Sequence, residues 1–148
     1  MPQAREIGRA DCERLLREAE VGRAAVSTAE GPHIVPVTYT VVDDTIVIRT
    51  TALSLLGTYG PNAMLAFEVD HFDQERRTGW SVVARGRCWA ELDPHEVAGL
   101  RRQVPRPWVS GNRNLYLRMR WECISGRALG EDWTRLRESS VHDPLLAV

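Results

Sequence analysis

Lysine is absent from this chain of 148 residues, and all 19 of its basic side chains are arginine. We attribute this bias to G+C-rich coding rather than to function. Cysteine is scarce as well: Cys12, Cys88 and Cys123 are odd in number and far apart, which argues against a disulfide framework. Because each cysteine fits an apolar periodicity, we expect three buried free thiols.

Long apolar runs are also missing. Nowhere do eighteen apolar residues occur together, and the first residues carry charge, so the sequence supports neither a membrane span nor a signal peptide. A formal net charge of -1 gives no electrostatic argument for binding nucleic acid or an anionic membrane. We therefore expect a cytoplasmic protein whose length suits one folded domain with a single core.

Several sequence signatures of catalysis are absent. The chain has neither of the glycine-rich loops that cradle phosphates, G-x-x-x-x-G-K-[ST] and G-x-G-x-x-G, and it has no G-x-S-x-G serine elbow. It has no C-x-x-C or H-E-x-x-H motif, and its four histidines are scattered along the sequence. We therefore expect no metal site.

The sequence does contain a series of short β-like runs with few helices. Apolar residues from Asp11 to Ala19 repeat at helical spacing, which predicts a short amphipathic helix. Three β-like runs follow, at Arg23–Thr28, His33–Val41 and Thr45–Thr50, and turns of hairpin length separate them. Such short connections predict an antiparallel meander, because they leave no room for crossover helices.

The second half of the chain continues this pattern. Residues Thr78–Leu92 alternate between an apolar face and a largely polar face, as expected of a long strand with one face in a core. The other predicted elements are a helical turn at Thr51–Tyr59, a strand at Met64–Val69, a polar loop at Asp70–Gly79, a helix from Asp93-Pro94, and final strands at Leu115–Trp121 and Cys123–Leu129. Six or seven strands with two or three small helices are typical of a closed antiparallel barrel. We assign residues 1–130 to this domain and residues 131–148 to a polar C-terminal tail.

Two residues interrupt the predicted strands. Gly86, at the centre of Thr78–Leu92, predicts a bend or bulge where the sheet curls. Pro36 predicts an edge strand or a bulge, because proline cannot donate a hydrogen bond to a neighbouring strand. An interrupted strand leaves backbone groups free to bind something else.

Candidate binding residues follow the third strand directly. Arg49, Thr50, Thr51 and Ser54 combine a guanidinium with three hydroxyls at the start of a helical turn, a set that can hold a phosphate. The same residues also suit a surface arginine beside an ordinary helix N-cap, and residue types alone favour that second interpretation.

Two other pairs carry less weight. Trp80 and Trp108 offer large flat surfaces beside loops, although a lone tryptophan more often packs in a core or an interface. Glu68 and Asp70 lie two residues apart near a strand end, where paired carboxylates can do acid–base work. More often such carboxylates are solvated or cap a turn.

Taken in order, six stretches of this sequence resemble the pyridoxamine 5'-phosphate oxidase-like family of the flavin-binding split-barrel superfamily. They are "VGRAAVS", "GPHIVPVTY", "IVIRTTALSLL", "LAFEVDHFDQERRTGWSVVARGRCWAEL", "RPWVSGNRNLYLRMR" and "ISGRAL". The most specific is "AFEVD" followed by "TGWSVVARG". The resemblance covers about Cys12 to Leu129 and implies a mainly β fold, a six-stranded antiparallel split barrel that pairs as a homodimer with two cofactor sites between the subunits.

The resemblance also implies which residues bind the cofactor. By position they are Pro36, Val37 and Thr38 along the isoalloxazine ring, Arg49 and Thr50 at the ring edge and phosphate, Ser54 at the phosphate, Trp80 and Ser81 where the long strand borders the cofactor, and Trp108 and Arg113 in a loop expected from the partner subunit. We expect Trp80 or Trp108 to shield the ring from water.

One position departs from the family pattern. Many relatives read G-S-K-L or G-T-K-L after the arginine strand, whereas this chain reads L-S-L-L, so that Leu55 stands where a lysine that neutralises the phosphate is expected. A buried phosphate without a cationic partner is costly. Either Arg49 suffices, or a different cofactor tail binds, or the site has decayed.

The function that the resemblance implies is an oxidoreductase that uses FMN to transfer hydride or electrons to or from a small organic substrate. Two alternatives stay open. One is a reductase of the same superfamily that uses an 8-hydroxy-5-deazaflavin coenzyme, or FAD, in place of FMN. The other is a dimeric protein that binds a flavin or haem without turnover. Vitamin B6 oxidase activity itself is not expected, because no pyridoxal-phosphate pocket is recognisable in the sequence.

Overall fold

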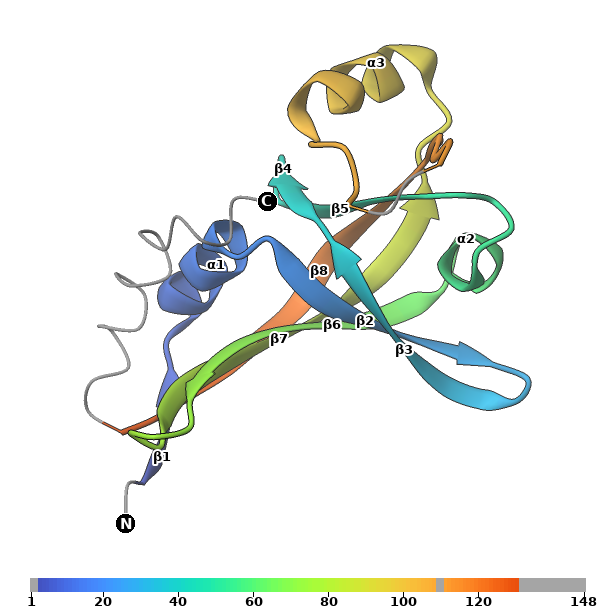
Figure 1. The fold of residues 1–148 in the computed structure, drawn as a ribbon. Helices are drawn as coiled ribbons and strands as arrows, with labels where there is room; N and C mark the ends of the chain where they lie inside the picture. The colour runs from blue at the N-terminus through green and yellow to red at the C-terminus, as the bar shows by residue number, and fades with distance from the viewer. Residues whose placement is uncertain (1–2, 109–110, 131–148) are drawn as a thin grey trace.

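The computed structural model describes residues 3–108 and 111–130, and one curled antiparallel sheet makes up most of it (Figure 1). Within these residues the eight strands are β1 (Ala4–Ile7), β2 (Val21–Thr28), β3 (Gly31–Thr38), β4 (Thr40–Val42), β5 (Thr45–Thr50), β6 (Met64–Asp73), β7 (Thr78–Ala90) and β8 (Leu115–Leu129). The helices are α1 (Arg9–Glu18), α2 (Leu55–Tyr59) and α3 (Pro94–Gln103). The mainly β antiparallel fold that the sequence predicted is confirmed.

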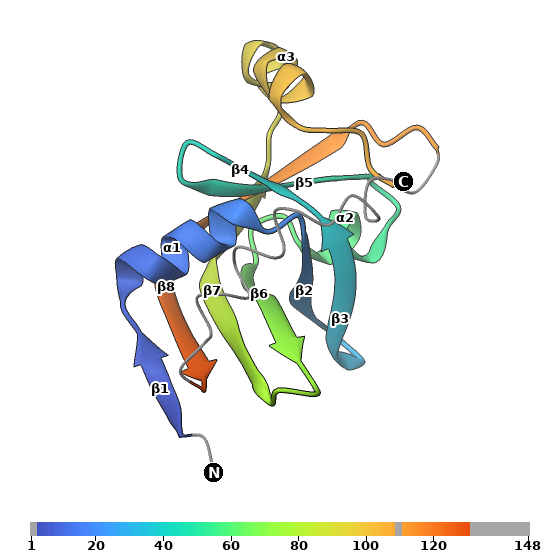
Figure 2. The same ribbon diagram turned by 60° about the vertical axis from the view of Figure 1, so that its left-hand side comes forward.

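The sheet curls because its two ends are joined by one residue. The hydrogen-bonded strand order is β3-β2-β6-β7-β8-β5-β4, and β1 pairs with β8. Strands β3 and β4 stand at opposite ends of this order, yet only Tyr39 separates them in the chain. Because one residue spans at most about 3.6 Å, the two ends approach each other and the sheet forms a half-barrel (Figure 2).

A β-bulge lets the sheet bend in the middle of β7 and β8. Gly86 pairs with Trp121 while the preceding residue of β7 pairs with Cys123, so Glu122 has no partner on β7. Here the two backbones lie so close that a Cβ atom on Gly86 would be 1.8 Å from the carbonyl oxygen of Arg120. Only glycine fits at this position, and the predicted bulge at Gly86 is confirmed.

The same bulge changes which residues of β8 face the solvent. Cys12 and Cys88 are buried free thiols as expected, but Cys123 is exposed, so the expectation is wrong for this residue. The extra residue at Glu122 shifts the alternation of β8 by one position and turns Cys123 outward. Burial raises the pKa of the Cys88 thiol to about 12 and raises the pKa of Cys12 above its ordinary value.

The β6–β7 hairpin is longer than the sequence predicted. Strand β6 continues to Asp73, which pairs with Thr78, so residues 74–77 alone form the turn. The polar loop expected at Asp70–Gly79 is therefore wrong. The polar composition of this segment suggested a loop, because this part of the hairpin includes outward-facing polar pairs such as Asp70 with Ser81.

Three further differences lie at the ends of strands. The run expected at His33–Val41 is divided at Tyr39, whose backbone N–H donates to the carbonyl oxygen of Glu20 at 3.0 Å. Strand β1 was not predicted, because three of its four residues are exposed and give no alternating pattern. The two final runs form the single strand β8. Within the part of the chain that the structure describes, the strand of Pro36, β3, pairs only with β2, so the predicted edge position is confirmed.

The helices pack on two separate apolar clusters. Cys12, Leu15 and Leu16 of α1 are buried in the main core enclosed by the curled sheet. Helix α3 covers the opposite side of β5 and β8 with a second cluster made of Val42, Val47, Leu100, Val104 and Tyr116. Asp93 caps α3 as expected, and its side chain accepts a hydrogen bond from the backbone N–H of His95 at 2.8 Å. None of the helices in the described part of the chain is long and apolar enough to cross a membrane.

Candidate functional site

A cavity of about 370 Å³ lies where α1 ends, β3 passes into β4, and the chain leaves α3. Four parts of the chain form its walls. They are residues 17–20, where α1 ends, residues 38–41, Arg49 on β5, and residues 104–108. Pockets for small molecules typically measure about 300–1,000 Å³, so this volume suits one ring system rather than a large ligand. Three residues predicted from the sequence, Thr38, Arg49 and Trp108, meet here.

Tyr39 joins two walls of the cavity. Its hydroxyl donates to the carbonyl oxygen of Leu16 at 2.5 Å, and its backbone N–H donates to the carbonyl oxygen of Glu20. Its ring meets the ring of Phe67 edge-on, with centroids 4.7 Å apart. Burial raises the pKa of Tyr39 well above its ordinary value, so the hydroxyl stays protonated and keeps donating. The end of α1 is thereby fixed against the β3–β4 link.

Arg49 is held in place without using its whole guanidinium. Its Nε donates to the carbonyl oxygen of Arg113 at 2.7 Å, and its guanidinium carbon lies 5.3 Å from the centroid of the Tyr116 ring. Within the described residues its terminal nitrogens make no hydrogen bond. They are available to a carbonyl or anionic group of a ligand in the cavity.

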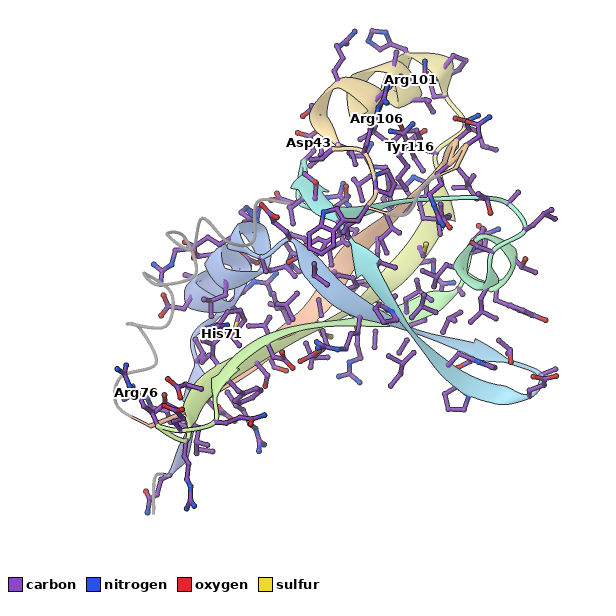
Figure 3. The ribbon with its side chains drawn as sticks, in the orientation of Figure 1. Asp43, His71, Arg76, Arg101, Arg106 and Tyr116 are labelled. Atoms are coloured by element: carbon purple, nitrogen blue, oxygen red, sulfur yellow. The ribbon has the colours of Figure 1, made fainter. Side chains whose placement is uncertain are left out.

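The other two arginines of the cavity differ in their surroundings. Arg17 forms an ion pair with Asp44, and its guanidinium carbon lies 5.5 Å from the centroid of the Trp121 ring. Arg106 is exposed and has no ion pair among residues 3–108 and 111–130. Figure 3 shows Arg106 and Tyr116 between α3 and the sheet. The walls formed by β5 and by the segment after α3 are therefore the cationic side of the cavity.

The predicted hydroxyl group cluster lies beside Arg49 in the chain but is bonded internally. Thr50 Oγ1 lies 2.7 Å from Ser54 Oγ, which accepts from the backbone N–H of Gly57 at 2.9 Å and donates to the carbonyl oxygen of Thr51 at 2.9 Å. Ser54 is the N-cap of α2. None of these hydroxyls lines the cavity, so a phosphate would have to compete with the cap for them.

The remaining predicted residues of β3 and α2 point in different directions. Leu55, the first residue of α2, is half-buried and packs against the main core. Val37 does the same from β3, while Pro36 is exposed on the free edge of the sheet. Thr38 alone of the three predicted β3 residues lines the cavity.

Trp80 and Ser81 lie away from the cavity. Trp80 is 6% exposed within the main core, and its indole N–H is buried with no hydrogen-bond partner in the described part of the chain. Its cross-strand partner His71 lies on the opposite side of the structure from Arg106 (Figure 3). Trp108 is 67% exposed at the cavity, so within one chain it is the tryptophan placed to shield a ligand.

Two parts of the cavity wall were not predicted from the sequence. They are residues 17–20 and Arg106 with its flanking prolines. The first was expected only as the end of an amphipathic helix, and the second as an unstructured loop. No local pattern marks them, because the bond between Tyr39 and Leu16, which brings α1 here, joins residues far apart in the sequence.

Comparison with known proteins gives a consistent family. The family model described as pyridoxamine 5'-phosphate oxidase matches residues 8–128. The uncharacterized protein Rv0080 of Mycobacterium tuberculosis (strain ATCC 25618 / H37Rv) is 32% identical over 126 residues, which cover 82% of each chain. The FAD binding protein from Mycobacterium smegmatis has a similar structure, with a TM-score of 0.69, 26% identity, and coverage of 85% of this chain and 98% of that one. An FAD-binding protein from Mesorhizobium loti, at 22% identity, shares the fold, with a TM-score of 0.73 over 88% of this chain and 100% of that one.

Proposed function

The chain belongs to the pyridoxamine 5'-phosphate oxidase family, and we propose that it binds a flavin in the cavity beside Arg49 and transfers hydride or electrons between that flavin and a small organic substrate. The observation that carries the proposal is the meeting of Thr38, Arg49 and Trp108 around one cavity of suitable size. These are residues that the family resemblance implied for the cofactor. The flavin, when bound, supplies the redox chemistry, and the protein binds and orients it.

The side chains of the cavity fit a planar heterocycle with a polar edge. The terminal nitrogens of Arg49 are donors for a carbonyl or a partially negative ring nitrogen. Trp108 presents a large exposed face that can cover a ring and exclude water. Among the strands of the described residues, β3 pairs only with β2, so its backbone groups near Thr38 are open to a ligand.

The second part of the proposal concerns the phosphate tail of the cofactor, which distinguishes FMN from FAD. The hydroxyls of Thr50 and Ser54 already bond each other and the α2 backbone, and Leu55 supplies no charge. A terminal phosphate at this point would therefore be weakly held, which disfavours the FMN that the resemblance implies. The similar protein from Mycobacterium smegmatis binds FAD. Both observations favour FAD, whose diphosphate is not terminal.

A cofactor panel tests the proposal. The purified protein is titrated with FMN, FAD and an 8-hydroxy-5-deazaflavin coenzyme, and the melting temperature and the dissociation constant are measured for each. We expect FAD or FMN to stabilise the protein and to be reduced by a reduced nicotinamide nucleotide or a reduced flavin. Binding of the deazaflavin alone would change the cofactor, binding without electron transfer would indicate a storage protein, and binding of none would end the redox proposal.

Arg49 gives the proposal a residue-level test. Arg49→Ala is expected to weaken flavin binding more than tenfold, or about 1.4 kcal/mol, because it removes a charged donor with free terminal nitrogens from the cavity. The matched control is Arg101→Ala, which removes an exposed arginine of α3 outside the cavity. An unchanged dissociation constant for Arg49→Ala would exclude Arg49 from the site.

A homodimer is also part of the proposal. In the family that the sequence resembles, the cofactor lies between subunits, so a second copy would complete the wall of the cavity.

A further inference from the structure

Arg106 is a cation of the cavity wall that no described residue neutralises. Its side chain is exposed, and it forms neither an ion pair nor a hydrogen bond within the described part of the chain. The other two arginines of the cavity are engaged, since Arg17 forms an ion pair with Asp44 and Arg49 donates to the carbonyl oxygen of Arg113. A free guanidinium beside a cavity suits a phosphate, because its planar fork can donate two parallel hydrogen bonds to one phosphate.

The backbone on both sides of Arg106 is restrained. Val104, two residues earlier, is buried in the second apolar cluster, and its backbone N–H donates to the carbonyl oxygen of Leu100 at 2.8 Å. Pro105 and Pro107 flank the arginine directly. Proline fixes its own φ angle, and the residue before a proline is confined to extended conformations. The position of Arg106 is therefore largely set before a ligand binds, which lowers the entropic cost of binding.

The cavity is large enough for the ring of FAD but not for the whole cofactor. Its volume of about 370 Å³ suits one ring system, so the ribityl chain, the diphosphate and the adenosine would leave through its mouth. Exposed lining residues, Arg106 and Trp108 among them, form this mouth. The charged part of the tail therefore passes the segment that carries Arg106.

The other charges of the cavity direct an anion to the same segment. The wall at the end of α1 includes Glu18 and Glu20, whose carboxylates repel a phosphate. Arg17 of that wall has its charge compensated by Asp44. The segment after α3 contributes Arg106 and no acidic residue to the cavity.

The phosphate position that the family resemblance implies is already occupied by bonds within the chain. Ser54 Oγ lies 2.7 Å from Thr50 Oγ1 and accepts a hydrogen bond from the backbone N–H of Gly57 at 2.9 Å. Leu55 packs against the main core and supplies no cation. A phosphate bound there would have to break the helix cap and would gain no charge partner, which is costly.

We propose that Arg106 binds the diphosphate of FAD at the mouth of the cavity, and that this contact replaces the phosphate position at the start of α2. The inference rests on the flavin of the proposed function and specifies the residue that selects its tail. Each phosphate of the diphosphate carries a negative charge, so the guanidinium gains a charge-assisted hydrogen bond that riboflavin cannot offer. Arg49 remains the partner of the ring edge.

Two ligands with the same ring and different tails test the contact. Riboflavin has no phosphate and FAD has the diphosphate, so the ratio of their dissociation constants isolates the tail. In fluorescence titrations, Arg106→Ala should weaken FAD binding at least tenfold and change riboflavin binding by less than about twofold. The matched control is Arg101→Ala, which removes an exposed arginine of α3 that does not line the cavity and should leave both constants unchanged.

A variant with an added charge tests the alternative position. Leu55→Lys supplies the lysine that many relatives have at the start of α2. With the diphosphate at Arg106, this variant should not bind FAD more tightly than the natural chain does. Tenfold tighter binding of FAD would place the phosphate at α2 and overturn the inference.

Ionic strength gives a measurement that needs no variant. A contact between a phosphate and an exposed arginine weakens as the Debye length shortens from about 10 Å at 0.1 M salt to about 3 Å at 1 M. The affinity for FAD should therefore fall over this range, whereas the affinity for riboflavin should not. An equal response of the two ligands would count against a charged contact with the tail.

The outcomes separate this inference from the proposed function. Equal losses of riboflavin and FAD binding in Arg106→Ala, or no loss of either, would overturn the diphosphate contact and leave the flavin in the cavity. A natural chain that binds neither ligand would refute the proposed function, and the inference with it. Melting curves without ligand show that the variants are folded, and exposed positions such as Arg106 and Arg101 should shift the melting temperature by no more than about 2 °C.

Discussion

Two neighbouring parts of β8 present arginines to opposite surroundings: one part lies beneath α3 and the other is exposed. Arg118 and Arg120 are two residues apart on one face of β8. Arg118 is buried, with Glu91 and Glu96 at 3.4 and 3.3 Å and the Thr45 hydroxyl at 3.1 Å, whereas Arg120 is exposed opposite Arg87. A chain neutralises a charge internally where its own helix excludes water, and it leaves the charge unpaired where water or a second surface will cover it.

The bulge beside Arg120 gives the largest expected effect. Gly86→Ala should lower the free energy of unfolding by about 3 kcal/mol or more, because the new Cβ would meet the backbone of Arg120. For a chain of this size that loss lowers the melting temperature by roughly 10 °C. Gly99→Ala in α3 is the matched control, since its Cβ would meet only the end of Gln103 at 4.0 Å. Equal melting temperatures for the two variants would refute the steric argument.

The contrast between Arg118 and Arg120 gives the next largest expected effect. Arg118→Met should lower the free energy of unfolding by about 2–3 kcal/mol, because it leaves the carboxylate of Glu91 poorly solvated and unpaired. Arg120→Met should change it by no more than about 0.5 kcal/mol, as for an ordinary surface position. Urea denaturation in high salt and at low protein concentration measures both without a contribution from self-association. A similar cost at the two positions would remove the contrast between the regions.

Glu68 predicts a pH dependence of stability. Burial, with a smaller contribution from Asp70, raises the pKa of Glu68 to about 7, against the opposing effect of Arg23; Val83, opposite on β7, is uncharged. Because the folded chain holds the proton of this carboxyl more tightly than the unfolded chain does, the free energy of unfolding should fall as pH rises from 4.5 to about 7. Urea denaturation at a series of pH values measures this fall.

Glu68→Gln is the control for this dependence. The amide carries no titrating proton, so the slope of the free energy of unfolding against pH should be much smaller in urea denaturation at the same pH values. Equal slopes in the variant and the natural chain would show that another group titrates.

The cavity predicts the smallest effect. Trp108→Ala should weaken flavin binding roughly fivefold, or about 1 kcal/mol, because it removes an exposed ring from the cavity wall while Arg49 remains. Leu92→Ala removes a comparably exposed apolar side chain outside the cavity and should leave the dissociation constant unchanged. Fluorescence titration with the flavin measures both. Equal affinities would indicate that Trp108 does not cover the ligand.

Much of the fold was predictable because its causes are local. Alternation identified β7, hairpin turns identified the meander, and Asp93 with Pro94 identified the start of α3. The candidate site was predictable only in part. Thr38 and Arg49 line one cavity with Trp108 of the same chain, whereas the family resemblance implied that Trp108 comes from the partner subunit. Trp80 lies in the core and Ser54 caps a helix.

The sequence by itself determined the antiparallel strands, the bend at Gly86 and the edge position of Pro36, because each follows from the geometry of a few adjacent residues. Only the tertiary structure decided that Tyr39 fastens α1 beside Arg49 and that Arg118 is neutralised while Arg120 is not. These relations depend on strand register and on which helix covers which strand. Both are settled by packing between residues far apart in the chain, where local patterns carry no information.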